Sequence, residues 1–229
     1  MKRNAKILGL LLAGLCIATG CGKEQVPPAT LPPVTEKTIW LEELNLQAEN
    51  LSPYEGVYIE QGEADEKVRV SGVYALAFTN TSEQTIVDAH LVFSDGSQEL
   101  NFYFEMLPYG STTTVVEYDK KEVKSTSLQL VGSTVNYLKT GLENMDCLQI
   151  VDSEMGMLGL ENMTFTDLPE LEIYYRRGNP DGGTIGGPCY VIRMAGVEAR
   201  EVFYPEVEFW SEKCEIVNIL LYPEVSDGS

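Results

Sequence analysis

Apolar residues along much of this chain recur at every second position, which is the spacing of a β-strand with one buried face. Two neighbouring stretches, 86–93 and 100–104, show this alternation most clearly. We expect their inward-facing residues to be Val87, Ala89, Leu91 and Phe93 in the first stretch, and Leu100, Phe102 and Phe104 in the second. The sequence Ser94-Asp95-Gly96-Ser97 separates them, so the pattern predicts two strands joined by a turn.

The same style of sequence continues on both sides of these two strands. The stretch 73–78 is apolar on both faces, as expected of a strand inside a sandwich core. Further strands are predicted at 68–70, 112–118, 128–131, 147–151, 158–165, 171–175, 190–194, 201–204 and 215–221. Short strands separated by turn residues favour an all-β fold of two tandem antiparallel β-sandwiches, at residues 38–140 and 141–229.

The first 20 residues follow a different pattern. Three basic residues come first, an apolar run from Ile7 to Ala18 follows, and small residues then lead to Cys21. The run is too short to cross a membrane, which takes roughly 20 apolar residues. The sequence Ala18-Thr19-Gly20-Cys21 resembles a bacterial lipobox. This resemblance implies that the signal is cleaved before Cys21 and that Cys21, the new amino-terminal residue, is acylated. The alternative is an ordinary secretory signal with a coincidental cysteine.

Acylation of Cys21 predicts that the protein is held at a membrane. Two or more acyl chains such as palmitate make a stable anchor, whereas one chain binds only marginally. Residues 21–37 contain the pairs Pro27-Pro28 and Pro32-Pro33, which favour an extended polyproline II conformation. The sequence therefore predicts a signal peptide at 1–20, a Pro-rich tether at 21–37 and an extracytoplasmic, lipid-anchored location.

The chain is strongly acidic. The whole sequence carries 16 basic and 35 acidic residues, a formal net charge of −19. The predicted signal holds three of the basic residues and no acidic one, so the mature part carries 13 against 35, or −22. Such a surface repels nucleic acid and anionic lipid headgroups, which excludes nucleic acid as a partner. A cation-binding face or a face for a basic partner is the alternative to a merely soluble acidic surface.

Three cysteines remain after Cys21: Cys147, Cys189 and Cys214. An odd number cannot pair fully within one chain. Either Cys189 and Cys214 form a bridge between strands, or all three stay reduced. Neither a C-x-x-C sequence nor a second histidine is present, so the sequence predicts neither a zinc site nor any other metal or cofactor.

The residues that could support catalysis are few. His90 is the single histidine. Its neighbours Ala89 and Leu91 are predicted to face inward, so we expect His90 on the outer face of the strand. The stretch 182–187 is rich in glycine but lacks the Gly-Lys-Ser/Thr sequence of a phosphate-binding loop. We therefore predict no catalytic residues and no enzyme activity. An enzyme or enzyme accessory acting on cell-wall polymers, or a solute-binding lipoprotein, is the alternative.

Two segments carry a resemblance to a known group of proteins. They are Gly72-Val73-Tyr74-Ala75-Leu76-Ala77-Phe78-Thr79-Asn80-Thr81-Ser82 and Leu107-Pro108-Tyr109-Gly110-Ser111. In them the chain resembles the immunoglobulin-like modules of lipid-anchored envelope proteins of Gram-positive anaerobes. The resemblance implies two tandem immunoglobulin-like sandwiches and an envelope location, and it implies no activity. The Cys…Trp…Cys pattern of true immunoglobulin domains is missing from both halves.

A partner site is predicted in the second half. Loops at the ends of sandwiches often bind partners, and arginine and tyrosine are favoured interface residues. The candidate residues are Tyr174, Tyr175, Arg176, Arg177, Gly183 and Gly186. The alternative is that these aromatic residues pack normally and the arginines balance nearby carboxylates. The sequence thus predicts a surface lipoprotein with a non-catalytic binding or assembly role, whose partner is an envelope protein or a glycan.

Overall fold

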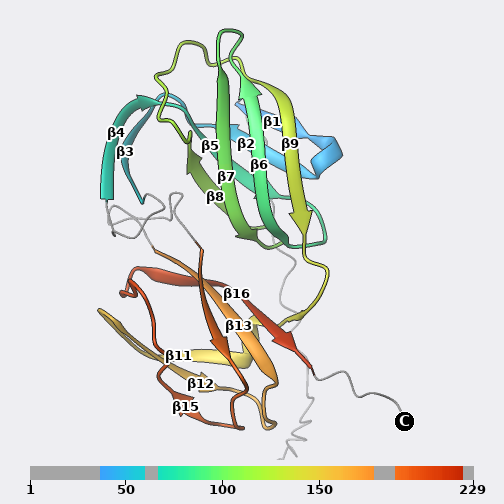
Figure 1. Cartoon of the computed structure of the whole chain (residues 1–229), viewed down its shortest axis with the longest axis vertical. Coiled ribbons are helices and arrows are strands. Elements are labelled where there is room, and N and C mark those ends of the chain that lie inside the picture. The colour runs from blue at the N-terminus through green and yellow to red at the C-terminus, as the bar shows by residue number, and fades with distance from the viewer. Residues whose placement is uncertain (1–36, 60–66, 178–188, 224–229) are drawn as a thin grey trace, which may run out of the picture.

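The computed structural model describes residues 37–59, 67–177 and 189–223 (Figure 1). Within these ranges the regular elements are β-strands and two single-turn 3-10 helices, and every strand pair is antiparallel. The predicted all-β fold class is therefore confirmed. None of the helices in the described ranges has the length and apolar character needed to cross a membrane. The signal peptide and Cys21 lie outside the described residues.

Two sheets packed face to face form the N-terminal sandwich, our name for residues 38–137. Its strands are β1 (Thr38–Leu41), β2 (Leu46–Asn50), β5 (Ala75–Asn80), β6 (Ile86–Ser94), β7 (Glu99–Leu107), β8 (Thr112–Val116) and β9 (Gln129–Tyr137). One sheet has the order β1-β2-β5-β8, and the other has the order β7-β6-β9. The 3-10 helix η1 (Glu42–Leu44) connects β1 to β2.

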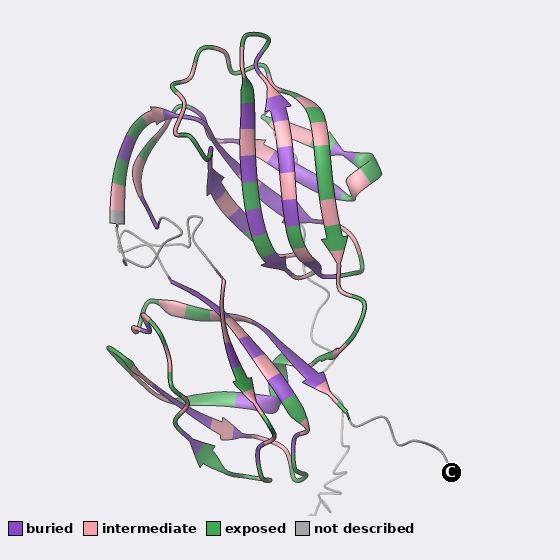
Figure 2. Cartoon of the chain, in the orientation of Figure 1, coloured by how far each residue is buried: buried purple, intermediate pink, exposed green. Residues whose placement is uncertain are grey.

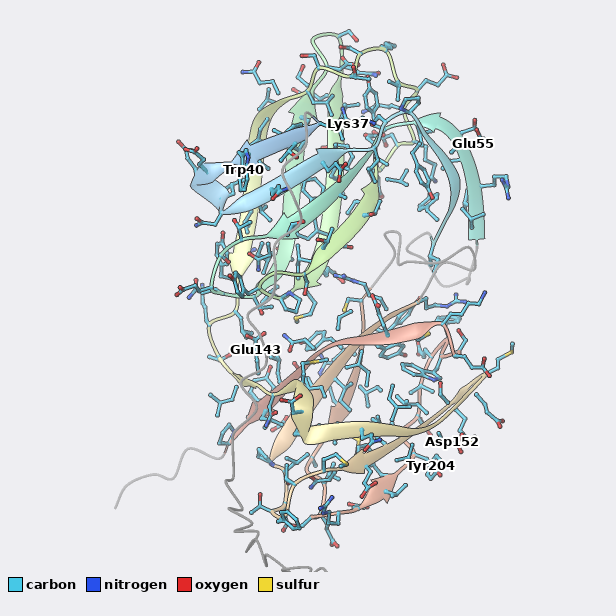
Figure 3. The ribbon with its side chains drawn as sticks, turned by 180° about the vertical axis from the view of Figure 1, so that it is seen from behind. Lys37, Trp40, Glu55, Glu143, Asp152 and Tyr204 are labelled. Atoms are coloured by element: carbon cyan, nitrogen blue, oxygen red, sulfur yellow. The ribbon has the colours of Figure 1, made fainter. Side chains whose placement is uncertain are left out.

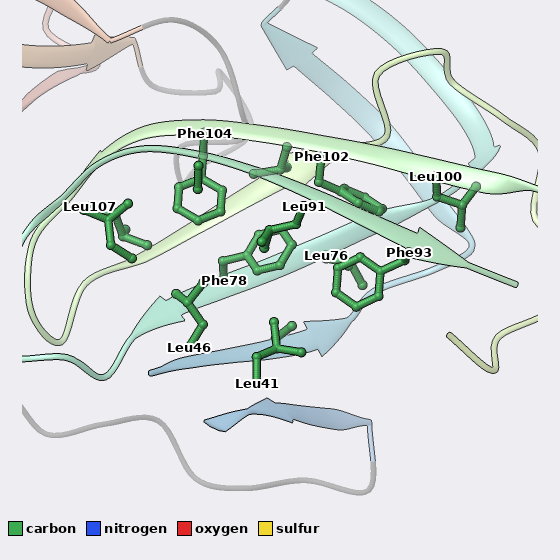
Figure 4. Packing of buried hydrophobic residues seen from close by; sticks show 14 of the residues in the cluster. Leu41, Leu46, Leu76, Phe78, Leu91, Phe93, Leu100, Phe102, Phe104 and Leu107 are labelled. Carbon is green, nitrogen blue, oxygen red and sulfur yellow. The ribbon is translucent and has the colours of Figure 1, made fainter. Parts of the chain in front are cut away.

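The core between these sheets is built from the predicted alternation. Buried and more exposed residues alternate along β6 and β7 (Figure 2), and all the expected inward residues are buried except Val87, which lies at a β-bulge. Phe78 of the facing sheet lies among them (Figure 4), with its ring centroid 5.0 Å from that of Phe104 and 5.9 Å from that of Phe102. Each such buried side chain contributes about 1.5–3 kcal/mol relative to an exposed one.

A hairpin of β3 (Tyr54–Ile59) and β4 (Lys67–Val73) curves away from the sandwich (Figure 1). It forms a two-stranded sheet of its own. Tyr58, Val70 and Val73 of the hairpin pack in a small apolar cluster with Ala75 and Val116 at the edge of the sandwich. The hairpin therefore stands beside the sandwich and contacts it along its length.

The C-terminal sandwich, our name for residues 142–222, also consists of two sheets. Its strands are β10 (Leu142–Glu143), β11 (Leu148–Glu154), β12 (Met157–Asn162), β13 (Glu170–Arg177), β14 (Tyr190–Met194), β15 (Val202–Phe203) and β16 (Cys214–Tyr222). The sheet orders are β11-β12-β15 and β10-β16-β13-β14. The 3-10 helix η2 (Met145–Cys147) precedes β11 and buries Cys147 in the core. The chain passes from one sandwich to the other between Tyr137 and Leu142.

The two sandwiches repeat one strand arrangement. In sequence order, β2, β5, β6, β7, β8 and β9 of the first correspond to β11, β12, β13, β14, β15 and β16 of the second. The sheet orders β2-β5-β8 and β7-β6-β9 then match β11-β12-β15 and β14-β13-β16. The immunoglobulin-like assignment and the independence of the two predicted domains stay predictions, but this correspondence indicates an internal structural repeat.

The same asparagine turn ends the corresponding strands β5 and β12. Asn80 Nδ2 donates to the Gln84 carbonyl at 2.8 Å, and its Oδ1 accepts from Ser82 N at 2.9 Å. Asn162 forms the equivalent bonds: its Nδ2 donates to the Thr166 carbonyl at 3.2 Å, and its Oδ1 accepts from Thr164 N at 2.8 Å. Both asparagines are fully buried, so these two Asn-x-Ser/Thr sequences form turns that the asparagine side chains stabilise.

Candidate functional site

Three of the four predicted partner-binding residues of β13 are buried. Tyr175, Arg176 and Arg177 expose 2%, 4% and 8% of their surface. Tyr175 continues the inward alternation of Leu171 and Ile173 and lies in the core, whereas Arg176 faces the other side of the sheet, where β7 covers it. The expectation that these side chains form an exposed patch is therefore wrong. The predicted loop residues Gly183 and Gly186 lie outside the described residues.

The two tyrosines of β13 have structural roles. The Tyr175 ring lies in the core of the C-terminal sandwich, 5.3 Å from both the Tyr190 and the Trp210 ring centroids. Burial raises the pKa of Tyr175 to about 12. Tyr174 is half-buried and donates a hydrogen bond of 2.7 Å to Glu172. Both rings are thus already engaged within their own sandwich.

Arg176 holds the two sandwiches together. Its guanidinium Nη2 donates to the backbone carbonyls of Glu105 and Met106 in β7, the second at 2.9 Å. Burial lowers the pKa of this guanidinium, although it stays cationic because an arginine pKa lies far above neutrality. A second link joins Glu143, labelled at this junction in Figure 3, to Thr85 of the N-terminal sandwich and to Asn218. Arg176 is therefore an internal contact of the protein.

Cys189 and Cys214 do not form the disulfide that the sequence left open. Cys214 of β16 lies opposite Arg177, whereas Cys189 immediately precedes β14 on the other side of β13. Strands are spaced about 4.8 Å apart, so the Cα atoms on either side of β13 are separated by about 9–10 Å. A disulfide needs less than about 7 Å. All three cysteines of the described ranges are free thiols, and burial raises the pKa of Cys189 to about 12.

A concavity lies in the N-terminal sandwich. A groove of about 930 Å³, which we call the edge groove, runs between the β3–β4 hairpin and the edge of the sandwich at β7 and β8. Tyr58 lines it from the hairpin, and His90 and Tyr103 line it from the outer face of the sheet. The loop after β8 closes it with residues 117–120. The groove thus collects residues from five parts of the chain.

Aromatic rings form one wall of the edge groove. His90 and Tyr103 are directly paired across β6 and β7, and their rings stack at 4.1 Å with an interplanar angle of 9°. The Tyr118 ring packs edge-on against Tyr103 at 5.3 Å. His90 covers one face of Tyr103, but Tyr103 and Tyr118 remain 45% and 65% exposed, so part of each residue is accessible to a ligand. His90 lies on the outer face, as predicted.

Two carboxylates lie on the same face of the sheet, next to the His90–Tyr103 pair. Asp88 and Glu105 lie directly opposite each other in the β6–β7 register, and both are exposed. Like charges in this position destabilise a sheet. Asp119 is paired with Lys121 at 3.0 Å. Asp88 accepts a hydrogen bond from Asn136 at 2.9 Å, and Glu105 accepts one from the Cys189 N–H at 3.4 Å. Neither carboxylate forms an ion pair within the described ranges. The groove also contains one basic residue, Lys120, which lies over the Tyr58 ring.

The edge groove presents aromatic rings beside exposed carboxylates. Groups of these two kinds attract organic cations. His90 Nε2 lies 3.0 Å from Asn101 Oδ1, and its ring is stacked on Tyr103, so neither contact pairs it with a nucleophile. The described residues contain no group of three or more His, Cys, Asp or Glu side chains arranged to hold a metal ion.

Comparison with protein families, with curated proteins and with solved structures finds no match to this chain. The residues of the groove therefore have to be interpreted from their own geometry. One signal in the sequence was available: alternation places Tyr103 outward, between the inward Phe102 and Phe104. The pairing of Tyr103 with His90 depends on the hairpin register, which the sequence pattern alone did not fix.

Proposed function

We propose that the protein is a lipid-anchored surface protein that binds a cationic segment of an envelope partner in the edge groove, without catalysis. The N-terminal sequence supports the location, through the apolar run and the lipobox-like sequence that ends at Cys21. The Pro-rich tether supports it further, since an extended stalk lifts a binding domain away from the membrane. The immunoglobulin-like modules suggested by sequence would serve as a rigid scaffold for this groove.

One observation carries the proposal. Asp88 and Glu105 place two carboxylates opposite each other beside the stacked rings of His90 and Tyr103. A lysine or arginine side chain of a partner would neutralise the carboxylates and lie against the exposed Tyr103 ring. The net charge of −19 would also accelerate the encounter with a basic segment.

A binding measurement with defined peptides tests this function. The probe is an oligolysine peptide, and a glutamine peptide of equal length reports binding that does not need positive charge. Tyr103→Ala should weaken oligolysine binding about threefold or more, because a cation–π contact at an exposed site contributes about 0.5–1 kcal/mol. Tyr204→Ala is the matched control, since Tyr204 is 58% exposed and lies outside the groove.

The outcome separates two classes of ligand. Equal effects of the two tyrosine substitutions, or equal binding of the two peptides, would contradict the proposed function. Binding of a neutral oligosaccharide of the cell wall, lost in Tyr103→Ala but not in Tyr204→Ala, would instead favour the glycan alternative. In that case the aromatic rings would carry the site and the carboxylates would not.

A further inference from the structure

The strand β9 is an open sheet edge. It has nine residues and pairs with β6 on one side, at the end of the sheet β7-β6-β9 (Figure 1). No described strand pairs with its other side. The backbone N–H and C=O groups on that side are therefore available to another strand, and an extended edge of this kind is a template for strand addition.

The second sandwich covers the corresponding edge. Its last strand, β16, is flanked by β10, with Leu142 opposite Leu221 and Glu143 opposite Leu220. The segment in the equivalent place of the first sandwich is β1, which precedes η1 as β10 precedes η2. β1 pairs with β2 instead. The repeat thus leaves β9 open where its counterpart is paired.

The sequence of β9 lacks the charged residues and prolines that usually prevent an edge strand from pairing with another chain. Its sequence, Gln129 to Tyr137, contains no charged residue and no proline. The other described edge strands of more than five residues all carry charge, as natural edges commonly do to prevent association. These strands are β3 with Glu55, β4 with Arg69, β7 with Glu99 and Glu105, and β11 with Asp152 and Glu154.

The side chains of β9 also leave apolar surface uncovered. Leu130, Val135 and Tyr137 pack against the core but stay half-buried, because no strand lies beyond them. Val131, at a bulge in the pairing with β6, is 53% exposed. An added strand would cover these groups and extend the core.

We propose that β9 pairs antiparallel with β9 of a second copy of this chain, which joins the two sheets into one of six strands. Antiparallel pairing of identical strands is compatible with two-fold symmetry, and it pairs the open edges of both molecules with each other. The absence of charge favours a second copy. Two molecules of net charge −19 approach best along an uncharged strand, whereas a basic partner would gain from acidic residues there.

A pairing centred on Thr134 gives a sharp test. Thr134 is exposed, and this register places it directly opposite Thr134 of the second copy, about 5 Å away. Thr134→Lys therefore brings two positive charges together, and Thr134→Glu brings two negative charges together. A mixture of the two variants pairs opposite charges. Self-association should be lost in each variant alone and restored in the mixture.

The experiment is sedimentation equilibrium of residues 22–229, which lack the signal peptide and the anchoring Cys21, at concentrations up to about 100 μM. We expect the unsubstituted chain to be a dimer, and either Thr134 variant to associate about tenfold more weakly. Val202→Lys is the matched control, because Val202 is 47% exposed and lies on the edge strand β15. A monomeric unsubstituted chain, dimers that persist in both Thr134 variants, or a mixture that stays monomeric would overturn the proposal.

Discussion

Tyr74 connects three segments of the N-terminal sandwich through one hydroxyl. This fully buried residue lies between β4 and β5, and its hydroxyl donates to Asp95 Oδ2 at 2.6 Å. The same oxygen accepts from the backbone N–H groups of Lys124 and Ser125, at 2.9 and 3.1 Å. It thereby fixes the turn after β6 and the long connection between β8 and β9.

The hydrogen bond between Tyr74 and Asp95 should make the stability of the fold depend on pH. The hydroxyl of Tyr74, assisted by donors from Ser97 and Gln98, lowers the pKa of the Asp95 carboxyl. Since the folded-state pKa lies below the unfolded value of about 3.9, this carboxylate stabilises the fold above about pH 4, and the contribution is lost as the pH falls. Tyr74→Phe should therefore lower the free energy of unfolding at neutral pH, and lower it by less near pH 2.

Urea unfolding of Tyr74→Phe and of the parent protein at several pH values measures this difference. Tyr118→Phe is the matched control, because the Tyr118 side chain is 65% exposed. A loss of stability that is the same at pH 7 and pH 2 would show that the bond to Asp95 does not stabilise the folded state.

A second prediction concerns the contact of Arg176 with β7. Replacing it by alanine leaves the carbonyls of Glu105 and Met106 without their guanidinium donor, at a cost of about 1–3 kcal/mol for buried groups. The contact between the sandwiches should loosen, and limited proteolysis should cut faster between Tyr137 and Leu142. Arg193→Ala is the control, because Arg193 bonds Glu172 within one sheet. Equal cleavage rates in the two variants would contradict this role.

Among the strands, the sequence pattern predicted most and missed β1, β2, β3 and β10. β6, β7 and β14 lie close to their predicted positions. β9 was predicted as a short strand at 128–131 because its later residues, Gly132 to Asn136, are mostly polar. Polar residues suffice there because β9 is the end strand of its sheet within one chain, so fewer of its side chains are buried. The sequence could not show this, since edge position is decided by pairing.

The candidate site was the least predictable part for the same reason. The sequence placed His90 and Tyr103 on outer faces, but their meeting depends on the β6–β7 register and on the β3–β4 hairpin, which was only partly predicted. The predicted patch is buried for two reasons: Tyr175 continues the inward alternation of Leu171 and Ile173, and Arg176 docks onto β7. Only the first of these has a signature in the hydrophobic pattern.

The repeated asparagine turns test the equivalence of the two sandwiches. Asn80 and Asn162 each satisfy several buried backbone groups, so alanine at either position should cost about 1–3 kcal/mol. Asn80→Ala should lower the unfolding midpoint of the N-terminal sandwich, and Asn162→Ala that of the C-terminal one. Hydrogen exchange resolved by residue can follow both. Loss of protection spread evenly over the whole chain in both variants would show that the sandwiches unfold as one unit.

At the scale of the whole molecule, the chain combines an anchor predicted from sequence with two repeated sandwiches. Cys21→Ala should release the protein from membranes or leave it unprocessed, because the predicted acylation needs that thiol. The measurement is partition between membrane and soluble fractions, together with the mass of the product. Cys16→Ala is the control, because Cys16 follows Leu15 and lacks the small residue expected before an acylated cysteine. Unchanged mass and partition in Cys21→Ala would reject the anchor.

The central claim is that the edge groove binds a cationic segment through Asp88 and Glu105. The most direct measurement is the affinity of the mature chain for oligolysine, compared with that of the double variant Asp88→Asn/Glu105→Gln, at low and high salt. We expect the double variant to bind about tenfold more weakly at low salt, and the difference to shrink as salt screens the exposed charges. Equal affinities of the two proteins at low salt would contradict the account.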